Sequence, residues 1–228
     1  VIMGSPEALQ KSPAAWVLTA GHEMFHRFQA SKDSVAKSES LQIGPKGDSS
    51  WHLAFPFPYQ DAEVMRLVHL QGYLAWLAAC SVNEEDATYN MGAAVEAARV
   101  YRAYLQKLTG DEKAYSYSQH QEWTEGVATY FEYKLAQRAA TGYQPTVAYS
   151  SLPGFEKYEA VWRNQYQASP FLAKHAGRAA RDRNAFYHLG MGKALALDKV
   201  DPSWKKRYFL PGVWLNDILV TAIEAPRQ

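Results

Sequence analysis

The chain has 228 residues, of which 47% are hydrophobic, 14% aromatic and 21% charged. This is the composition of a globular protein with a sizeable core, and it excludes disordered and collagen-like chains. The net charge of +1 provides no field for a nucleic acid or a membrane surface, and the single cysteine excludes an intrachain disulfide and a cysteine-based zinc cage. No apolar run approaches the roughly 20 residues of a membrane span. We therefore expect one domain over residues 1–228, with no nucleic-acid partner and no membrane span.

Polar and glycine-containing stretches divide the chain into blocks of helical periodicity, and no block shows the alternation of a convincing strand. The predicted helices cover residues 12–30, 59–79, 83–108, 119–138, 155–180, 183–199 and 214–223. A break is expected near Pro170, and residues 31–50 and 143–154 are predicted to be loops. The predicted fold class is mainly α, with little or no β-sheet.

The first predicted helix begins with Ser12 as a plausible N-cap and a proline at the first helical position. Glu23 is the only charged residue between positions 11 and 27, so we expect this helix to be largely buried. Apolar residues at helical spacing predict its packed face: Val17, Ala20, Met24 and Phe28. The opposite side of the helix is then expected to face a cleft.

That opposite side carries the motif H-E-x-x-H, at His22-Glu23-Met24-Phe25-His26. Residues four apart are neighbours on one helical face, so both imidazoles can bind one ion. Catalytic zinc usually has three protein ligands and an open position for water, and Glu23 is placed to act on that water as general base. The motif therefore predicts one Zn²⁺ ion held by His22 and His26.

The competing interpretation is a buried helix whose two histidines are hydrogen-bonded core residues. Glu23 argues against it, because a lone carboxylate in so apolar a helix is costly unless it has a partner or a task. A third metal ligand must come from elsewhere in the chain, and the best segment is residues 122–132.

This segment contains Glu125-Gly126, Ala128, Tyr130 and Glu132. Together with the H-E-x-x-H helix, it resembles the gluzincin zinc metallopeptidases, in particular the aminopeptidase N-like and glycyl aminopeptidase-like families. Those families carry a second helix with a W-x-x-E-G-x-A-x-Y-x-E type pattern. The resemblance implies that the first glutamate of this pattern, Glu125, is the third ligand. Glu122 is the rival, because it lies on the same helical face.

The resemblance implies a zincin-like helical catalytic domain. The two predicted helices between His26 and Glu125, about residues 59–108, look like a family-specific helical insertion that forms a wall of the cleft. Gluzincins usually place a β-sheet before the zinc helix, and only residues 1–3 could be the end of such a strand here. We therefore expect an upstream domain or a partner to supply the sheet, unless the sheet is dispensed with.

A zinc hydrolase also needs a donor for the oxyanion of its tetrahedral intermediate. Tyr187-His188-Leu189-Gly190 resembles the Y-x-K-G motif of the aminopeptidase N-like enzymes, which implies that Tyr187 is this donor. His188 and Tyr149 are the alternatives, and an ordinary buried tyrosine is the competing interpretation in a chain with 15 of them. Cys80 is expected to be an inert buried thiol, and the histidines outside the motif (His52, His69, His120 and His175) are expected to be surface or core groups.

The function expected from these features is a zinc-dependent metallopeptidase that hydrolyses peptide bonds of a peptide or protein through a zinc-activated water, with Glu23 as general base. Exopeptidase and endopeptidase action both stay open, because the G-x-M-E-N motif that reads a free amino terminus is not found. The alternative is a non-catalytic zinc- or peptide-binding module, and a weaker one is a helical structural domain without metal. Because many relatives are exported, a bacterial exported or periplasmic enzyme is the expected setting.

Overall fold

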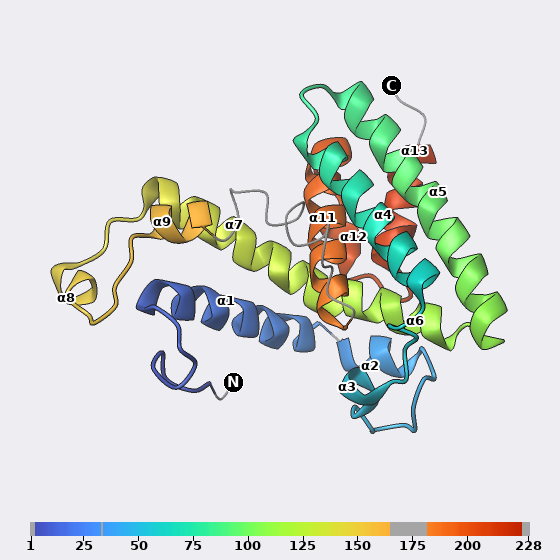
Figure 1. Cartoon of the computed structure of the whole chain (residues 1–228), viewed down its shortest axis with the longest axis horizontal. Helices are drawn as coiled ribbons and strands as arrows, with labels where there is room; N and C mark the ends of the chain where they lie inside the picture. The colour runs from blue at the N-terminus through green and yellow to red at the C-terminus, as the bar shows by residue number, and fades with distance from the viewer. Residues whose placement is uncertain (1–2, 33, 165–181, 225–228) are drawn as a thin grey trace.

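The computed structural model describes residues 3–32, 34–164 and 182–224. All regular structure in these ranges is helical, which confirms the mainly α class (Figure 1). The helices are α1 (Pro13–Ala30), α2 (Ser34–Glu39), α3 (Trp51–Ala54), α4 (Ala62–Cys80), α5 (Glu84–Thr109), α6 (Lys113–Gln121), η1 (Glu122–Gly126), α7 (Val127–Gly142), α8 (Val147–Ser150), α9 (Tyr158–Trp162), α11 (Asn184–Val200), α12 (Lys205–Tyr208) and α13 (Leu215–Glu224). Taken singly, the described helices are too short or too polar to cross a lipid bilayer.

The largest body of the molecule is a bundle in which α4 and α5 form an antiparallel pair that packs on α11 (Figure 1). The side chains of Asp61 and Asn83 accept hydrogen bonds from the first backbone amides of α4 and α5, so each helix begins at a capped residue. The proposed insertion between His26 and Glu125 is thus a main part of the core. Of the described residues in this pair, Trp76 alone lines the cavity described below.

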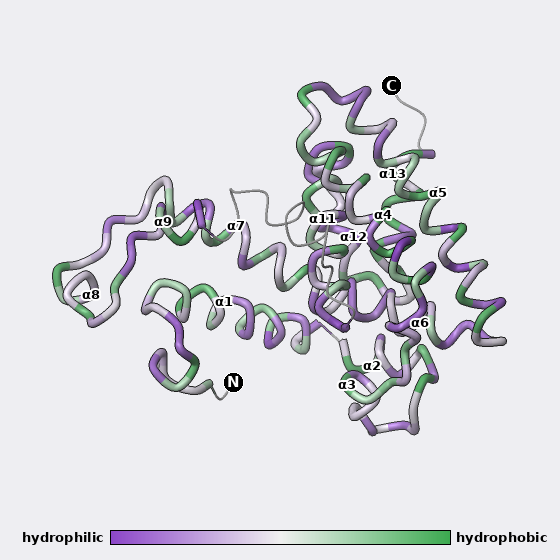
Figure 2. The backbone as a smooth tube through the Cα atoms, viewed as in Figure 1, coloured by the Kyte–Doolittle hydropathy of each residue, from purple (hydrophilic) through white to green (hydrophobic). Residues whose placement is uncertain are grey.

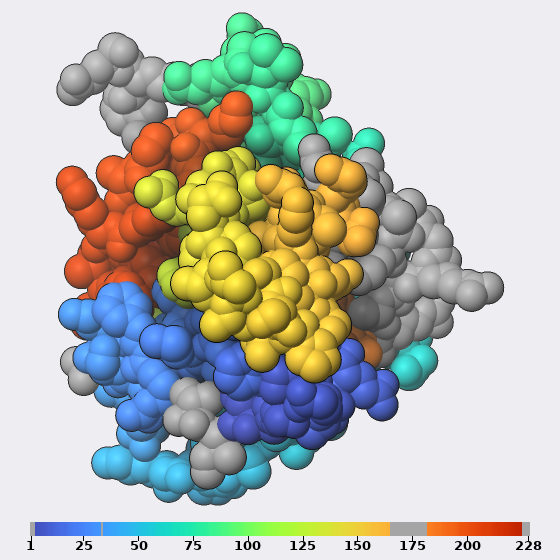
Figure 3. All heavy atoms as spheres, turned by 90° about the vertical axis from the view of Figure 1, so that its left-hand side faces the viewer, coloured from blue at the N-terminus to red at the C-terminus, as the bar shows by residue number. Residues whose placement is uncertain are grey.

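A second layer crosses this bundle. The run α6, η1 and α7 continues almost without interruption, and α1 lies antiparallel beside α7 (Figure 1). Hydrophobic residues fill the first turns of α1, and hydrophilic residues gather in its second half (Figure 2). Leu18 and Ala136 pack between the two helices, together with Tyr158 of α9. Figure 3 shows the segment of α8 and α9 seated against α1 at this end of the molecule.

The turn η1 crosses α11 at a contact between two glycines. A Cβ atom on Gly126 would lie 2.5 Å from the Cα of Gly190, and a Cβ on Gly190 would lie 2.4 Å from the carbonyl oxygen of Glu122. Both obstacles are backbone atoms, which cannot rotate away as a flexible side chain could. The backbones of η1 and α11 therefore approach as closely as they do because neither residue has a side chain.

A buried ion pair lies beside this crossing. Lys193 of α11 is fully buried, and its Nζ donates to Glu122 Oε2 at 2.6 Å, to Asn216 Oδ1 at 2.7 Å and to Gln71 Oε1 at 3.1 Å. These partners come from η1, α13 and α4. A buried ammonium needs such a full set of acceptors, and the network therefore ties four helices together around the Glu122 carboxylate.

The predicted packed face of α1 is wrong. Met24 is 67% exposed and Phe28 is 46% exposed, whereas His22 is only 7% exposed. The reason is that α7 lies against the face that carries Leu18 and His22, so that the stripe beginning at Val17 turns outward as it runs along the helix. The histidine face is therefore the packed face of α1.

Other boundaries also differ from those expected. The predicted loop at 31–50 contains α2, whose Lys37 Nζ donates to the carbonyls of Tyr208, Leu210 and Val213, and the predicted loop at 143–154 contains α8. The helix predicted at 119–138 extends from 113 to 142 as α6, η1 and α7, because its buried face continues in both directions. Cys80, at the end of α4, is exposed rather than buried. Most of the helix predicted at 155–180, with Pro170 and His175, lies outside the described residues.

The glycine crossing can be tested by adding a methyl group. We expect Gly126→Ala or Gly190→Ala to lower the free energy of unfolding by about 1–3 kcal/mol or more, because the added Cβ overlaps backbone atoms. Gly92→Ala in α5 is the matched control, since a Cβ there meets nothing within 4 Å and should raise stability by up to about 1 kcal/mol. Urea unfolding measures all three, and equal effects at Gly126 and Gly92 would contradict the close contact.

Candidate metal centre

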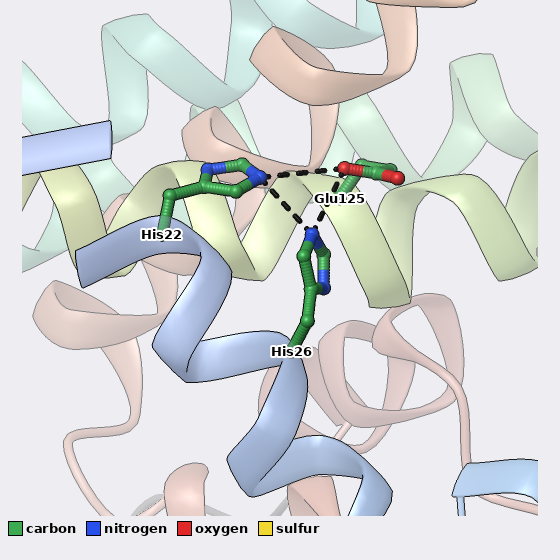
Figure 4. Close-up of side chains that lie close together, drawn as sticks. All are labelled: His22, His26 and Glu125. Atoms are coloured by element: carbon green, nitrogen blue, oxygen red, sulfur yellow. Dashed lines mark hydrogen bonds and ion pairs between the residues drawn. The ribbon is translucent and has the colours of Figure 1, made fainter. Parts of the chain in front are cut away.

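The helices α1 and η1 bring His22, His26 and Glu125 together at one point (Figure 4). The Nε2 atoms of the two imidazoles lie 3.1 Å apart. Oε2 of Glu125 lies 3.4 Å from Nε2 of His22 and 3.2 Å from Nε2 of His26. Three candidate ligand atoms thus form a nearly equilateral triangle.

This triangle fits zinc. With metal–ligand distances near 2.0–2.1 Å, two ligands of a tetrahedral zinc are separated by about 3.3–3.4 Å. The three observed separations, 3.1, 3.2 and 3.4 Å, lie close to that value. Two imidazole nitrogens and a carboxylate oxygen are the ligand set of several catalytic zinc sites, which leave a fourth position open.

The ring orientation of His26 is fixed by Gln29. His26 Nδ1 lies 2.8 Å from Oε1 of Gln29, an atom that can only accept a hydrogen bond. The Gln29 amide cannot be reversed, because its Nε2 donates to the carbonyl oxygens of Trp123, at 3.2 Å, and Thr124, at 3.0 Å. Nδ1 of His26 therefore carries the proton, and Nε2 presents its lone pair to the centre of the triangle.

The outer ring nitrogen of His22 lies beside a carboxylate, at an ion-pair distance and without the geometry of a hydrogen bond. This Nδ1 atom lies 3.3 Å from Oε2 of Glu132, which is two turns beyond Glu125 on the same side of the helix. A carboxylate accepts, so it favours a proton on Nδ1 and a lone pair on Nε2. Ligating histidines usually make such a contact through the nitrogen that is not bound to the metal, because it sets the tautomer and the ring orientation.

Three acceptor atoms that face one another repel unless a positive charge lies between them. Burial opposes protonation of His22, but the carboxylates of Glu125 and Glu132 outweigh it and raise its pKa to about 9. Burial of Glu125 acts to raise its pKa, yet hydrogen bonds from His22, His26 and Tyr187 prevail and lower that pKa below its usual range. The charges of the triangle therefore favour a cation at its centre, either a proton or a metal ion.

Glu125 lies in a single turn of π-helix, and this turn separates it from its rival. Glu122, three residues earlier, is 1% exposed and is held by Lys193, so its carboxylate belongs to the buried network on the other side of η1. An extra residue per turn re-aims side chains, and such turns are frequent at functional sites. The geometry brings Glu125, and not Glu122, to the two histidines.

The triangle opens into a cavity of about 710 Å³. Glu23, Tyr187 and His188 line this cavity together with the three candidate ligands. Its remaining lining residues are Lys11, Thr19, Leu53, Trp76, Thr129, Glu132, Tyr133, Arg183, Asn184 and Met191. The predicted base and the predicted oxyanion donor thus reach the same space as the metal ligands.

Tyr187 lies beside two of the candidate ligands. Its ring stacks on that of His22, with centroids 6.1 Å apart, and its hydroxyl is close enough to the Glu125 carboxylate for each group to shift the pKa of the other. Burial and the neighbouring Glu125 carboxylate raise the pKa of Tyr187, so its hydroxyl keeps its proton at neutral pH. Tyr149 is elsewhere, because its hydroxyl hydrogen-bonds with that of Tyr158 at 3.0 Å in the apolar hollow between α1, α7 and α8.

His120 is a buried core residue, as expected. It lies 2.8 Å from the hydroxyl of Ser38, and burial lowers the pKa of its imidazole to about 3. Gln29 and Glu132, which contact the outer nitrogens of the two candidate histidine ligands, were not predicted. Two signals were available: Gln29 follows His26 by three residues and Glu132 follows Glu125 by seven, so each lies one or two turns further along the same helical face.

Comparison with known proteins gave no match to any family model, curated protein or solved structure.

The raised pKa of His22 predicts how zinc affinity depends on pH. Below about pH 9 the ion must displace a proton from His22, so affinity should rise about tenfold per pH unit from pH 7 and level off above pH 9. Competition with a chromophoric chelator measures the zinc affinity, and a flat profile from pH 7 to 9 would contradict the assignment.

The same pKa affects the stability of the metal-free protein. The folded-state pKa of His22 lies above the ordinary 6.5, so this group stabilises the fold fully below pH 6.5 and loses its contribution as pH rises through about 9.

Proposed function

We propose that this chain is a zinc-dependent peptidase, with His22, His26 and Glu125 as the metal ligands. The observation that carries the proposal is the convergence of three candidate ligand atoms at 3.1–3.4 Å, with the outer nitrogen of His26 hydrogen-bonded to Gln29 and that of His22 3.3 Å from a Glu132 oxygen. Three acceptor atoms that face one another would destabilise a purely structural core, because they repel. When bound, zinc supplies Lewis-acid chemistry: it lowers the pKa of a water and polarises a carbonyl group.

Glu23 is the general base of the proposed reaction. It follows His22 directly, and its side chain lines the same cavity. The water oxygen forms a bond to the peptide carbonyl carbon while Glu23 accepts one proton from that water. Glu23 then delivers the proton to the amide nitrogen as the carbon–nitrogen bond breaks, and the second water proton leaves with the new carboxylic acid. The products are one peptide acid and one free amine.

Tyr187 is the proposed oxyanion donor. Its hydroxyl is protonated at neutral pH and lies within hydrogen-bonding reach of Glu125, so a modest rotation would let it donate to the carbonyl oxygen of a substrate in the cavity. His188 lines the same cavity from the next position of α11 and is the alternative donor.

The resemblance to gluzincins supports the same proposal from the residues. In that family pattern the first glutamate is the third ligand, which here is Glu125. The last glutamate of the pattern is Glu132, which lies 3.3 Å from His22. A zinc-binding or peptide-binding module without turnover would need the ligands but not a carboxylate at position 23, so Glu23 in the cavity favours catalysis over that alternative.

The role of Glu23 is tested by an isosteric change. We expect Glu23→Gln to retain one zinc per chain and to lose hydrolysis of a peptide library by at least about 10²-fold, because the amide cannot accept the proton. Glu125→Gln should instead lose zinc, since it removes a charged ligand, and Glu39→Gln on the exposed face of α2 should change neither property. Metal analysis and product release measure these outcomes. Hydrolysis that survives Glu23→Gln would refute the mechanism, and zinc without hydrolysis in the unaltered chain would favour the binding module.

The oxyanion donor is tested by removing one oxygen atom. We expect Tyr187→Phe to keep zinc and to lower kcat by about 10²–10³-fold with little change in KM, because the hydroxyl acts only when negative charge develops. His188→Gln serves as the matched variant in the same helix, and it should lower kcat far less. If the two effects are reversed, His188 is the donor and Tyr187 is only a packing partner of His22.

A further inference from the structure

Arg183 places a guanidinium at the edge of the candidate metal centre. It is the residue that precedes α11, it lines the cavity, and its side chain is 31% exposed. Its Nη1 lies 3.9 Å from Oε1 of Glu125, the carboxylate oxygen that is turned away from the two imidazoles. The guanidinium carbon lies over the ring of Tyr187, 5.6 Å from the ring centroid.

Most N–H donors of this guanidinium are not engaged by the described residues. Arginine carries five N–H donors in a planar fork that matches the geometry of a carboxylate. Among the described residues, the one ion pair of Arg183 is the 3.9 Å contact with Glu125, which is too long for a hydrogen bond. The contact with the ring of Tyr187 is a cation–π contact, which is attractive for the guanidinium and involves no hydrogen-bond acceptor atom. Arg183 is therefore positioned to donate to an anion in the cavity.

The state of the acidic residues in the cavity also favours an anionic ligand. Its described lining has three carboxylates, and each is engaged: Glu125 with the imidazoles, Glu132 with His22, and Glu23 as the proposed base. No described carboxylate of the lining is left to bind the ammonium group of a peptide amino terminus. The cavity thus offers a cation to a ligand, in addition to the metal.

We propose that Arg183 binds the terminal α-carboxylate of a peptide, so that this chain removes residues from the C-terminus of its substrates. This inference rests on the proposed zinc peptidase function and names its substrate class. One residue of extended peptide spans about 3.3–3.6 Å, and a charged hydrogen bond adds about 2.8 Å. Because Arg183 Nη1 is 3.9 Å from the third candidate ligand, a carboxylate bound to Arg183 would lie near the candidate ligands, within the reach of a short stretch of extended peptide.

Binding to an inactive protein tests this without turnover. The zinc-loaded Glu23→Gln chain is titrated with three ligands: acetyl-Ala-Phe, its C-terminal amide, and acetyl-Ala-Glu amide, which carries a carboxylate only on its side chain. We expect the free acid to bind at least tenfold more tightly than either amide. Adding Arg183→Gln should reduce that difference to less than twofold while zinc content stays at one per chain, because Arg183 is not a ligand. Arg66→Gln is the matched control, since Arg66 is exposed on α4 and pairs with Glu63 outside the cavity.

Each other result overturns the inference in a recognisable way. Equal binding of the acid and the amides would show that no carboxylate is recognised. Tight binding of the side-chain carboxylate would move the preference from the chain end to an internal acidic residue. A preference for the acid that persists in Arg183→Gln would show that the carboxylate binds another cation of the cavity, the metal or Lys11, instead. A chain that holds no zinc would overturn the proposed function itself, and zinc analysis before the titration separates that outcome from the other three.

Discussion

The close crossing of η1 and α11 is the constraint on which the candidate site depends. Gly126 and Gly190 let the two backbones meet, and the buried pair of Glu122 and Lys193 holds them on the adjacent side. Glu125 and Tyr187 lie one residue before Gly126 and three residues before Gly190, so this single crossing sets how far the third ligand is from the proposed oxyanion donor. A buried ion pair is a strong restraint, because removal of either partner leaves an uncompensated charge.

The histidine helix is fixed to this crossing by one amide. Gln29 of α1 donates to two backbone carbonyls of η1 and accepts from His26, so the same side chain docks the helix and sets the tautomer of a ligand. On the other ligand, Glu132 comes from α7, which continues η1. Packing and the geometry of the candidate site are therefore linked: the contacts of α1 with η1 and α7 lie at the outer nitrogens of both imidazoles.

Several features follow from local rules and were predictable from the residues. The H-E-x-x-H spacing puts two histidines on one helical face, and capping and apolar periodicity predict α1, α4, α5 and α11 within a few residues of their ends. The packed face of α1 was not predictable in this way. Met24 and Phe28 of the predicted apolar stripe are exposed, and the burial of His22 depends on α7, which lies more than a hundred residues later in the chain.

The sequence by itself determined the mainly α class and the pair of histidines with Glu23 between them, and it predicted imidazole and carboxylate groups as the candidate ligands in a chain with one cysteine. Only the tertiary structure decided between Glu122 and Glu125, because both lie near one helical face and a π turn with a buried lysine sends them to opposite sides. It also decided which residues orient the ligands, and that Arg183 stands beside them. The physical reason is the distance along the chain over which each effect acts. Spacing along a helix fixes neighbours within two turns, whereas the burial, tautomer and charge of a side chain depend on the residues that other helices place beside it.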